Sequence, residues 1–334
     1  MTAKGSLYTG SNYYPEHKAA TDNMLLITDL KQIKETFKNS IITLGNFDGL
    51  HLGHQELIRM VTTRAKETGA AGMVVTFRPH PLKILAPEKC PPLISIYEEK
   101  IEFFEKLGID ILVKIPFTRE FSLMPPHDFV KNILCDLLGA KEIFVGYNYR
   151  FGKGREGNIQ KLREFGKEFG FTVREIEQIS LNGEVLSSTR IRQLLIEGEV
   201  EYASRLLGRP YAITGVVVKG DGRGKLLGFP TANIASKHMI VPSDGVYAVR
   251  IFARDKYYDG VVNIGMRPTF NKYETTIEVH IFNFNEDLYG EEISLFFIKR
   301  IRDEKKFANV EELISQIRKD IKIARSALAS SGSV

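Results

Sequence analysis

Residues 215–234 read GVVVKGDGRGKLLGFPTANI and are the most informative stretch of this chain. An apolar run leads into a loop in which three of the residues from 220 to 224 are glycine. Glycine lets backbone N–H groups approach a phosphate closely. Thr231 and Asn233 carry a hydroxyl and an amide that can hold a hydrated Mg²⁺ together with the phosphates it neutralises. The alternative is a tight hairpin, because Gly, Pro and Asn are ordinary turn residues.

A second nucleotide motif lies upstream, where residues 41–54 read IITLGNFDGLHLGH. An apolar strand runs into a Gly-rich turn that delivers His51 and His54 to the start of a helix. Two imidazoles beside the free N–H groups of a helix N-terminus form an anion site. A His-x-x-His pair alone could be half of a zinc site, but the surrounding glycines, Phe47 and Asp48 favour the His-x-Gly-His motif of nucleotidylyltransferases.

A third element, residues 187–192 (SSTRIR), lies between these two motifs. Ser187 or Ser188 can cap a helix that begins at Arg190, and two arginines beside hydroxyls form a triphosphate clamp. By itself this is a helix start with basic residues. Following a His-x-Gly-His loop, it resembles the second phosphate motif of the same transferases.

Strands and helices alternate over residues 23 to about 190, which predicts right-handed βαβ units and a parallel sheet. The predicted strands are 41–47, 72–77, 109–116, 142–147 and 172–176, and the predicted helices are 53–68, 97–107, 127–138 and 158–169. In such sheets the ligand lies beyond the carboxyl ends of the strands, at the switch in strand order. The His motif and a glycine-rich loop at 146–157 both follow strands, so in the order 3-2-1-4-5 they face each other there.

The pattern changes near residue 210, where short runs rich in Val, Ile, Tyr and Phe begin. These runs, 211–219, 245–253, 257–264, 275–284 and 292–301, predict five or six short strands that form a small all-β barrel, which we expect to have six strands. A terminal helix at about 309–325 has one apolar face that can cover the barrel. We therefore expect four segments: a flexible extension at 1–22, an α/β Rossmann-like domain at 23–205, the barrel domain at 206–327 and a flexible tail at 328–334.

Composition is that of a soluble globular protein of 334 residues with a formal net charge of +5. Lys and Arg alternate with Asp and Glu, so no clustered basic face indicates a nucleic-acid partner. No apolar run approaches the ~20 residues that span a bilayer, and the N-terminal residues lack the apolar core of a secretory signal. Cys90 and Cys135 lack metal-like spacing and are expected to be free thiols in a reducing cytosol. We expect a cytoplasmic protein without a membrane partner, as a monomer or weak homo-oligomer.

From about residue 24 to 325 the chain resembles the bacterial bifunctional riboflavin kinase/FAD synthetase family, in both halves and in the family's order. The first half contributes the His motif, residues 76–81 (TFRPHP), the 146–157 loop and residues 187–192. The second half contributes 220–233, 244–247 (DGVY), 263–270 (NIGMRPTF), 277–280 (IEVH), 287–290 (DLYG) and 302–307 (RDEKKF). Arg78 occupies a variable position in this pattern.

The resemblance implies two reactions with ATP as co-substrate and Mg²⁺ as cofactor. The barrel would phosphorylate riboflavin to FMN, and the sheet domain, a nucleotidylyltransferase, would adenylylate FMN to FAD with release of pyrophosphate. Glu278 would be the general base of the kinase, although on residue type alone it is a solvated strand carboxylate. His51 and His54 would stabilise charge on the α-phosphate. His80 could contact substrate or simply pack a Pro-His-Pro turn.

The resemblance also implies the remaining site residues, which fall into groups by the ligand that they are expected to bind. Nucleotide and phosphate binding is expected from Gly45, Asn46, Phe47, Asp48, Gly53, Ser188, Thr189, Arg190, Arg192, Gly220, Gly222, Gly224, Lys225 and Gly228. Flavin binding is expected from Asn148, Arg150, Phe151, Arg302 and Phe307, and metal binding from Thr231 and Asn233.

Two rival interpretations remain at this point. A nucleotidylyltransferase of another metabolite could carry the barrel as an accessory module, but the Pro-Thr-Ala-Asn loop together with Glu278 argues against this. A non-enzymatic nucleic-acid binder would interleave aromatic residues with Lys and Arg on one sheet face, and the barrel strands lack that pattern.

Overall fold

The computed structural model describes residues 24–33, 35–181, 183–220, 222–268 and 273–331. Over these residues the chain forms two compact units, residues 24–188 and residues 189–331. The extension expected at residues 1–22 lies outside the described residues. Across the described part of the chain, no helix is long and apolar enough to cross a membrane.

The first unit is built on a parallel six-stranded sheet in the order β1-β4-β3-β2-β5-β6. The strands are β1 (Leu25–Ile27), β2 (Ser40–Leu44), β3 (Ala71–Arg78), β4 (Ile111–Pro116), β5 (Ala140–Gly146) and β6 (Thr172–Ile176). The predicted order 3-2-1-4-5 corresponds to β4-β3-β2-β5-β6 and is confirmed. The short edge strand β1 was missed, because three residues are too few to show a strand pattern.

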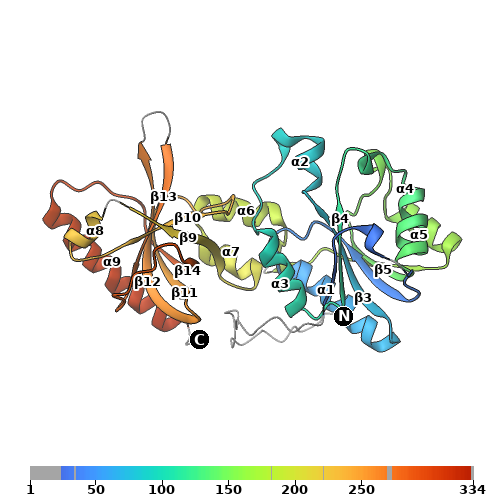
Figure 1. The fold of residues 1–334 in the computed structure, drawn as a ribbon, viewed down its shortest axis with the longest axis horizontal. Helices are drawn as coiled ribbons and strands as arrows, with labels where there is room; N and C mark the ends of the chain where they lie inside the picture. The colour runs from blue at the N-terminus through green and yellow to red at the C-terminus, as the bar shows by residue number, and fades with distance from the viewer. Residues whose placement is uncertain (1–23, 34, 182, 221, 269–272, 332–334) are drawn as a thin grey trace. The chain divides into compact units, whose positions relative to one another are not determined.

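Helices cover both faces of this sheet (Figure 1). They are α1 (Leu52–Thr68), α2 (Pro81–Leu85), α3 (Tyr97–Lys106), α4 (Pro126–Asp128) and α5 (Ile159–Phe169), and a π-helix (Phe129–Leu137) continues α4. Short 3-10 turns occur at Leu30–Gln32, Pro87–Lys89, Phe121–Leu123 and Lys153–Arg155, and a small hairpin pairs β7 (Ser180–Leu181) with β8 (Glu184–Val185). The four predicted helices lie at α1, α3, α4 with the π-helix, and α5.

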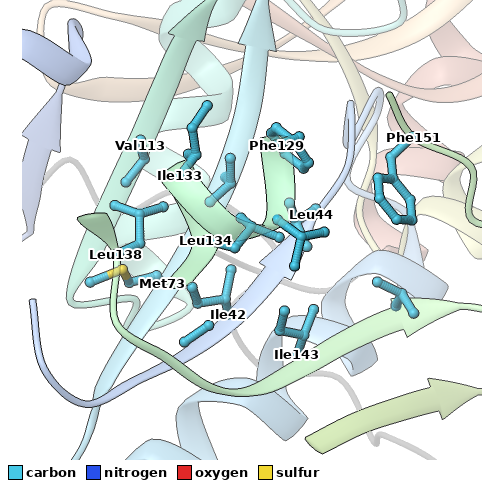
Figure 2. Packing of buried hydrophobic residues seen from close by; sticks show 14 of the residues in the cluster. Ile42, Leu44, Met73, Val113, Phe129, Ile133, Leu134, Leu138, Ile143 and Phe151 are labelled. Carbon is cyan, nitrogen blue, oxygen red and sulfur yellow. The ribbon is translucent and has the colours of Figure 1, made fainter. Parts of the chain in front are cut away.

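Two apolar layers hold the sheet, because successive residues of each strand point to opposite faces. Ile42 joins the layer under the π-helix and α5, whereas Ile41 joins the layer under α1 and α3. Figure 2 shows the first layer, with Leu134 of the π-helix and Phe151 packed near the strand residues. Burial on both faces explains why these strands read as continuous apolar runs.

The second unit contains a closed antiparallel barrel in the order β10-β13-β12-β11-β14-β9. The strands are β9 (Tyr211–Val218), β10 (Ala232–Ser236), β11 (Gly245–Ala253), β12 (Lys256–Pro268), β13 (Tyr273–Ile281) and β14 (Glu292–Arg302), and a short helix α8 (Arg223–Leu226) lies between β9 and β10. The predicted six-stranded barrel is confirmed. Its sixth strand, β10, begins within the 215–234 stretch.

Alternation divides the barrel residues between an inner and an outer face. Val262 and Val279 face each other across β12 and β13 and are fully buried in the interior. Helix α9 (Val310–Ser330) packs on the outer face, where Ala324 and Leu328 meet Val261 and other residues. The helix continues past residue 328, where the flexible tail was expected to begin, because Leu328 is buried at 1% exposure.

Helices α6 (Ser188–Glu197) and α7 (Val200–Leu207) precede the barrel, and α7 packs directly on β14 and β9. The Glu201 carboxylate accepts a hydrogen bond from the Arg300 amide at 3.3 Å, and the Arg300 guanidinium donates to the Glu197 carbonyl at 2.9 Å. The compact units therefore divide at residues 188 and 189, ahead of the boundary at 205 and 206 that the change in sequence pattern predicts.

We expect a fragment that begins at Thr189 to be markedly more stable than one that begins at Arg209. Val200, Leu206 and Leu207 of α7 are at most 1% exposed. Without the burial of three such side chains, the free energy of unfolding is lower by about 5 kcal/mol as an upper estimate. Urea denaturation of the two fragments, followed by circular dichroism, measures the difference. Equal midpoints would show that α7 does not stabilise the barrel.

Candidate active sites

The upstream motif forms a tight turn between β2 and α1. Phe47 and Leu50 both have positive φ angles, 48° and 42°, and this conformation costs a non-glycine residue about 1–2 kcal/mol. Their side chains are nevertheless buried, at 2% and 1% exposure, and the Phe47 ring packs edge-on against Phe104 at 5.6 Å. Burial of these side chains offsets the strain, so the apolar core holds the turn in place.

The two histidines of this turn stack on each other. Their ring centroids lie 3.7 Å apart with an interplanar angle of 19°. His51 is the N-cap of α1, and its Nδ1 accepts a hydrogen bond from the His54 amide at 3.4 Å. A Cβ on Gly53 would lie 3.2 Å from the His51 ring, so glycine gives this ring its space. Because Nδ1 is the acceptor, neutral His51 carries its proton on Nε2.

Burial lowers the pKa of His54 well below its ordinary value of 6.5, and the charges of His51 and Lys100 lower it further. His54 is therefore neutral near pH 7. Its Nδ1 is buried and has no hydrogen-bond partner among the described residues. A neutral imidazole stabilises an anion by donating a hydrogen bond rather than by carrying a charge.

Asp48 connects the turn to two distant segments. Its carboxylate is 5% exposed and accepts hydrogen bonds from the Ile94 amide at 3.0 Å and the Ser95 amide at 3.4 Å. Its carbonyl accepts from the Ser188 hydroxyl at 2.9 Å. The His motif is thus joined directly to Ser188 of the third element. The backbone donors around the carboxylate support a positioning role for Asp48.

Asn46 is held by two neighbours that sequence reasoning did not link to it. The His80 ring caps α2, where Nδ1 accepts from the Leu82 amide at 3.2 Å, and His80 Nε2 lies 3.1 Å from the Asn46 amide nitrogen. With Nδ1 as acceptor, neutral His80 has its proton on Nε2, so the Asn46 amide oxygen must face it. Lys100 donates to the Asn46 carbonyl at 2.9 Å. His80 therefore orients Asn46.

The other members of the upstream set lie around this turn and the start of α6. Gly45 extends the sheet by donating its amide to the Val75 carbonyl at 3.1 Å. Thr189, Arg190 and Arg192 lie in the first turns of α6, and the Arg190 guanidinium lies 5.9 Å from the Tyr202 ring. Their phosphate-binding roles stay predictions.

The loop at 146–157 separates the expected flavin residues into two environments. Asn148 and Arg150 are exposed and line a cavity of about 630 Å³ together with Arg155, Arg163 and Glu175. Phe151 instead is 7% exposed and packs in the core (Figure 2), with its ring 6.1 Å from that of Phe129. Flavin contact by these three residues stays a prediction.

In the barrel domain, two glycines of the phosphate loop pack on the expected metal ligands. A Cβ on Gly220 would lie 1.9 Å from the Asn233 amide nitrogen, and a Cβ on Gly224 would lie 3.0 Å from the Thr231 hydroxyl. Side chains at either glycine would displace these groups. The glycines therefore bring the loop backbone against Thr231 and Asn233, as phosphate binding requires.

Three further residues of the loop shape its turn. Gly222 and Gly228 have positive φ angles of 71° and 86°, a conformation that glycine adopts without strain. The Lys225 amide donates to the Gly222 carbonyl at 3.2 Å, and the Gly228 amide donates to the Lys225 carbonyl at 3.2 Å. The Lys225 side chain is exposed to solvent.

Glu278 lies in β13, directly opposite Asn233 of β10 on one side and Asn263 of β12 on the other. Its neighbours Ile277 and Val279 are buried at 4% and 0% exposure, so Glu278 points to the outer face. No hydrogen bond or ion pair engages its carboxylate within the described part of the chain. A half-buried carboxylate between two amides, beside a phosphate loop, can accept a proton from a bound hydroxyl.

His280 also lies on the outer face of the barrel, and it contacts the 215–234 stretch. Its Nδ1 lies 2.8 Å from the Pro230 carbonyl, and because a carbonyl only accepts, Nδ1 is the donor. The Phe229 ring stands edge-on to the imidazole at 5.9 Å. His280 thereby ties the segment before Thr231 to the strand that carries Glu278, a link that sequence spacing alone does not reveal.

A second cavity, of about 250 Å³, opens beside the same loop. Its lining combines Gly220 and Thr231 with Asp287 and Tyr289 from the segment that follows β13. Sequence reasoning named that segment only as part of the family pattern. The cavity shows that it lies next to the phosphate loop.

Arg302 and Phe307 also come together, with the guanidinium 5.7 Å from the ring. Arg302 is held by Asp320 of α9, which is 3% exposed and accepts from Arg302 Nε at 3.0 Å. Gln316 donates to the same carboxylate at 2.8 Å. This buried ion pair fixes the residues that follow β14. A flavin contact from Arg302 or Phe307 stays a prediction.

Comparison with known protein families finds a match in each half. The sequence model of the FAD synthetase family matches residues 33–190, and that of the riboflavin kinase family matches residues 207–328.

Relatives named bifunctional riboflavin kinase/FMN adenylyltransferase match over most of the chain. The protein from Buchnera aphidicola of Schizaphis graminum is 39% identical and the alignment covers 90% of this chain and 98% of the relative. The Bacillus subtilis protein is 39% identical over 86% and 92% of the two chains, and the Escherichia coli K12 protein is 37% identical over 85% and 91%. A Streptococcus pneumoniae crystal structure, described as a macrolide-efflux protein, has a TM-score of 0.82 at 32% identity and covers 91% of this chain and 99% of its own.

We expect His54 to make the folded protein less stable in mild acid. Because the folded-state pKa of His54 is lowered, the unfolded chain alone takes up this proton as the pH falls below about 6.5. Stability is therefore complete above that pH and decreases below it by up to about 1.4 kcal/mol per pH unit from this group. Urea unfolding between about pH 7.5 and 5 should show a shallower decrease in His54→Gln than in the unsubstituted protein.

His127 provides the matched control, because its side chain is 47% exposed. His127→Gln should follow the unsubstituted protein across the same pH range. Identical slopes for His54→Gln and the unsubstituted protein would contradict the lowered pKa.

Proposed function

This chain belongs to the family of bifunctional riboflavin kinases/FMN adenylyltransferases, and from that membership we propose which residues carry each reaction. The protein phosphorylates riboflavin to FMN with ATP, and it transfers AMP from ATP to FMN to give FAD and pyrophosphate. The riboflavin kinase match covers the barrel and the FAD synthetase match covers the sheet domain. The barrel is therefore a catalytic domain and not an accessory to an unrelated transferase.

In the kinase reaction, Glu278 accepts the proton of the riboflavin 5′-hydroxyl as that oxygen attacks the γ-phosphorus of ATP. A new P–O bond forms, the bond to the β-phosphate oxygen breaks, and ADP leaves. The observation that carries this proposal is the position of Glu278 beside Asn233, which packs on Gly220 of the phosphate loop. Loose phosphoryl-transfer transition states need positioning and charge neutralisation, which these residues supply.

The residues around Asn233 fit a Mg²⁺ ion. Mg²⁺ keeps several waters and takes few protein ligands in addition to substrate phosphates, and a hydroxyl with an amide oxygen matches that demand. Thr231 and Asn233 would hold it, and the closely packed Gly220 and Gly224 leave the loop backbone free for phosphate. The metal would supply charge neutralisation for the phosphates. His280 would keep Thr231 in place through its bond to the Pro230 carbonyl.

In the adenylyl transfer, a phosphate oxygen of FMN attacks the α-phosphorus of ATP and pyrophosphate leaves, with no covalent enzyme intermediate. His51 and the neutral His54 donate hydrogen bonds to the oxygens of the α-phosphate at the N-terminus of α1, where charge develops in the transition state. Asn46, oriented by His80, adds an amide at the same loop.

The remaining assignments follow the family. Arg190 and Arg192 would hold the leaving pyrophosphate, and Asn148 and Arg150 would line the flavin side of the sheet domain. Arg302 and Phe307 would contact riboflavin in the barrel domain. The use of ATP supports a cytoplasmic location.

We expect Glu278→Gln to lower FMN formation by about 10²–10⁴-fold, the range for loss of a general base. Glutamine keeps the size but cannot accept the proton, and conversion of supplied FMN to FAD should be unchanged. Chromatography of flavins after incubation with riboflavin or FMN and MgATP measures both activities. Glu292→Gln is the control, because this second strand carboxylate of the barrel is 58% exposed. A Glu278→Gln variant that keeps a tenth or more of the FMN rate would remove Glu278 from the mechanism.

We expect the reciprocal result for the histidines. His51→Ala or His54→Ala should lower FAD formation from FMN by about 10²–10³-fold and leave riboflavin phosphorylation intact. The same chromatographic assay applies, with His127→Ala as a control in the same domain. Loss of FMN formation in a folded His51→Ala protein would show that the two reactions are assigned to the wrong domains.

A further inference from the structure

Three cations surround one tyrosine ring at the carboxyl-terminal edge of the sheet, and none of the roles above uses this cluster. The Arg78 guanidinium carbon lies 4.3 Å from the centroid of the Tyr97 ring, Lys114 Nζ lies 5.2 Å from it and Lys100 Nζ lies 6.0 Å from it. Arg78 ends β3, Lys114 lies in β4 opposite Thr76, and Tyr97 and Lys100 stand in the first turn of α3.

These charges lack close carboxylate partners among the described residues. Arg78 forms an ion pair with Glu98 at 3.8 Å, but both side chains are at least 49% exposed, and such pairs contribute little. Lys100 donates to a backbone carbonyl, and burial lowers its pKa, although the nearby Asp48 charge opposes this. Like charges held close together repel each other, and a bound anion would remove that repulsion.

Tyr97 gives a second sign of an incomplete site. Its hydroxyl is buried and has no hydrogen-bond partner in the described ranges. Burial raises the pKa of this phenol to about 12, so the hydroxyl keeps its proton and remains a donor. Buried donors are normally satisfied, and a ligand or water in the cluster would satisfy this one.

The cluster is continuous with the adenylyl-transfer site. Lys100 binds the Asn46 carbonyl at 2.9 Å, and its charge contributes to the lowered pKa of His54. The charge of Arg78 also lowers the pKa of Lys100. A positive strip therefore runs from Lys100, near His54, to Arg78 and Lys114, along the edge where ligands bind in parallel sheets.

A purely structural role for the cluster explains less. One cation is enough to cover a face of the Tyr97 ring, whereas three are present. Arg78 also stands within the TFRPHP segment, two residues before His80, which orients Asn46. The cluster thus connects the TFRPHP segment, which carries Arg78, with the start of α3, which carries Tyr97 and Lys100.

We propose that Arg78, Lys100 and Lys114 form a subsite for a terminal phosphate group of a sheet-domain substrate, with the Tyr97 ring beneath it. This inference rests on the proposed adenylyl transfer. Both substrates carry such a dianionic group, the 5′-phosphate of FMN and the γ-phosphate of ATP. FAD has no terminal phosphate, because its two phosphates are joined to each other by an anhydride bond and each also carries an ester, whereas pyrophosphate has two.

The test compares Arg78→Met, Lys114→Met and the double variant in both directions of the reaction. Loss of one charge-assisted hydrogen bond to phosphate should raise the KM of the bound substrate about tenfold or more, with kcat changed far less. If the subsite holds FMN, the KM for FMN rises, and the KM values for ATP, FAD and pyrophosphate remain unchanged. If it holds ATP, the KM for ATP and for pyrophosphate rise and that for FMN stays.

Lys106→Met is the matched control, because Lys106 ends the same helix α3, is exposed and lies outside the cluster. It removes the same charge and should leave every KM unchanged. Circular dichroism of the same chains reports on folding. Unchanged KM values in the double variant would overturn the subsite while leaving the proposed adenylyl transfer standing. Absence of FAD formation in the unsubstituted protein would instead refute the proposed function itself.

Discussion

The hydrogen bonds of Asp48 are the constraint on which the adenylyl-transfer site depends. A short carboxylate inside the β2–α1 turn accepts from the Ile94 and Ser95 amides, and the carbonyl of the same residue accepts from Ser188. Three segments far apart in sequence are therefore fixed at one point. The histidine stack, the loop before α3 and the start of α6 all take their positions from this residue.

The two catalytic centres share a physical device, which is the removal of a Cβ where polar groups must approach each other. Gly53 leaves room for the His51 ring, and Gly220 leaves room for the Asn233 amide. In each case an alanine would push aside a side chain that we propose to bind a phosphate or its metal ion. Because the buried Phe47 and Leu50 side chains hold the β2–α1 turn in place, the histidine centre is organised before substrate arrives.

Much of the architecture could be predicted from the sequence, because periodicity distinguishes α/β from all-β segments. The parallel sheet and the barrel followed from the apolar runs, the strand order is the common one for such sheets, and the start of α1 at His51 followed from its motif. The Asn46–His80 contact and the Arg78–Tyr97 cluster could not be predicted. They join side chains from separate strands and loops, and their distances are set by tertiary packing rather than by spacing along the chain.

The outer-face position of Glu278 has a consequence for how this enzyme can change over time. The barrel owes its stability to interior residues such as Val262 and Val279, whereas Asn263 and Glu278 point away from that core. Substitutions that retune the chemistry need not open cavities, and substitutions that repack the interior need not disturb the reacting groups. In β12 and β13, the residues that stabilise the barrel therefore alternate with the residues of the proposed kinase site, so that evolution can change stability or reactivity with little effect on the other.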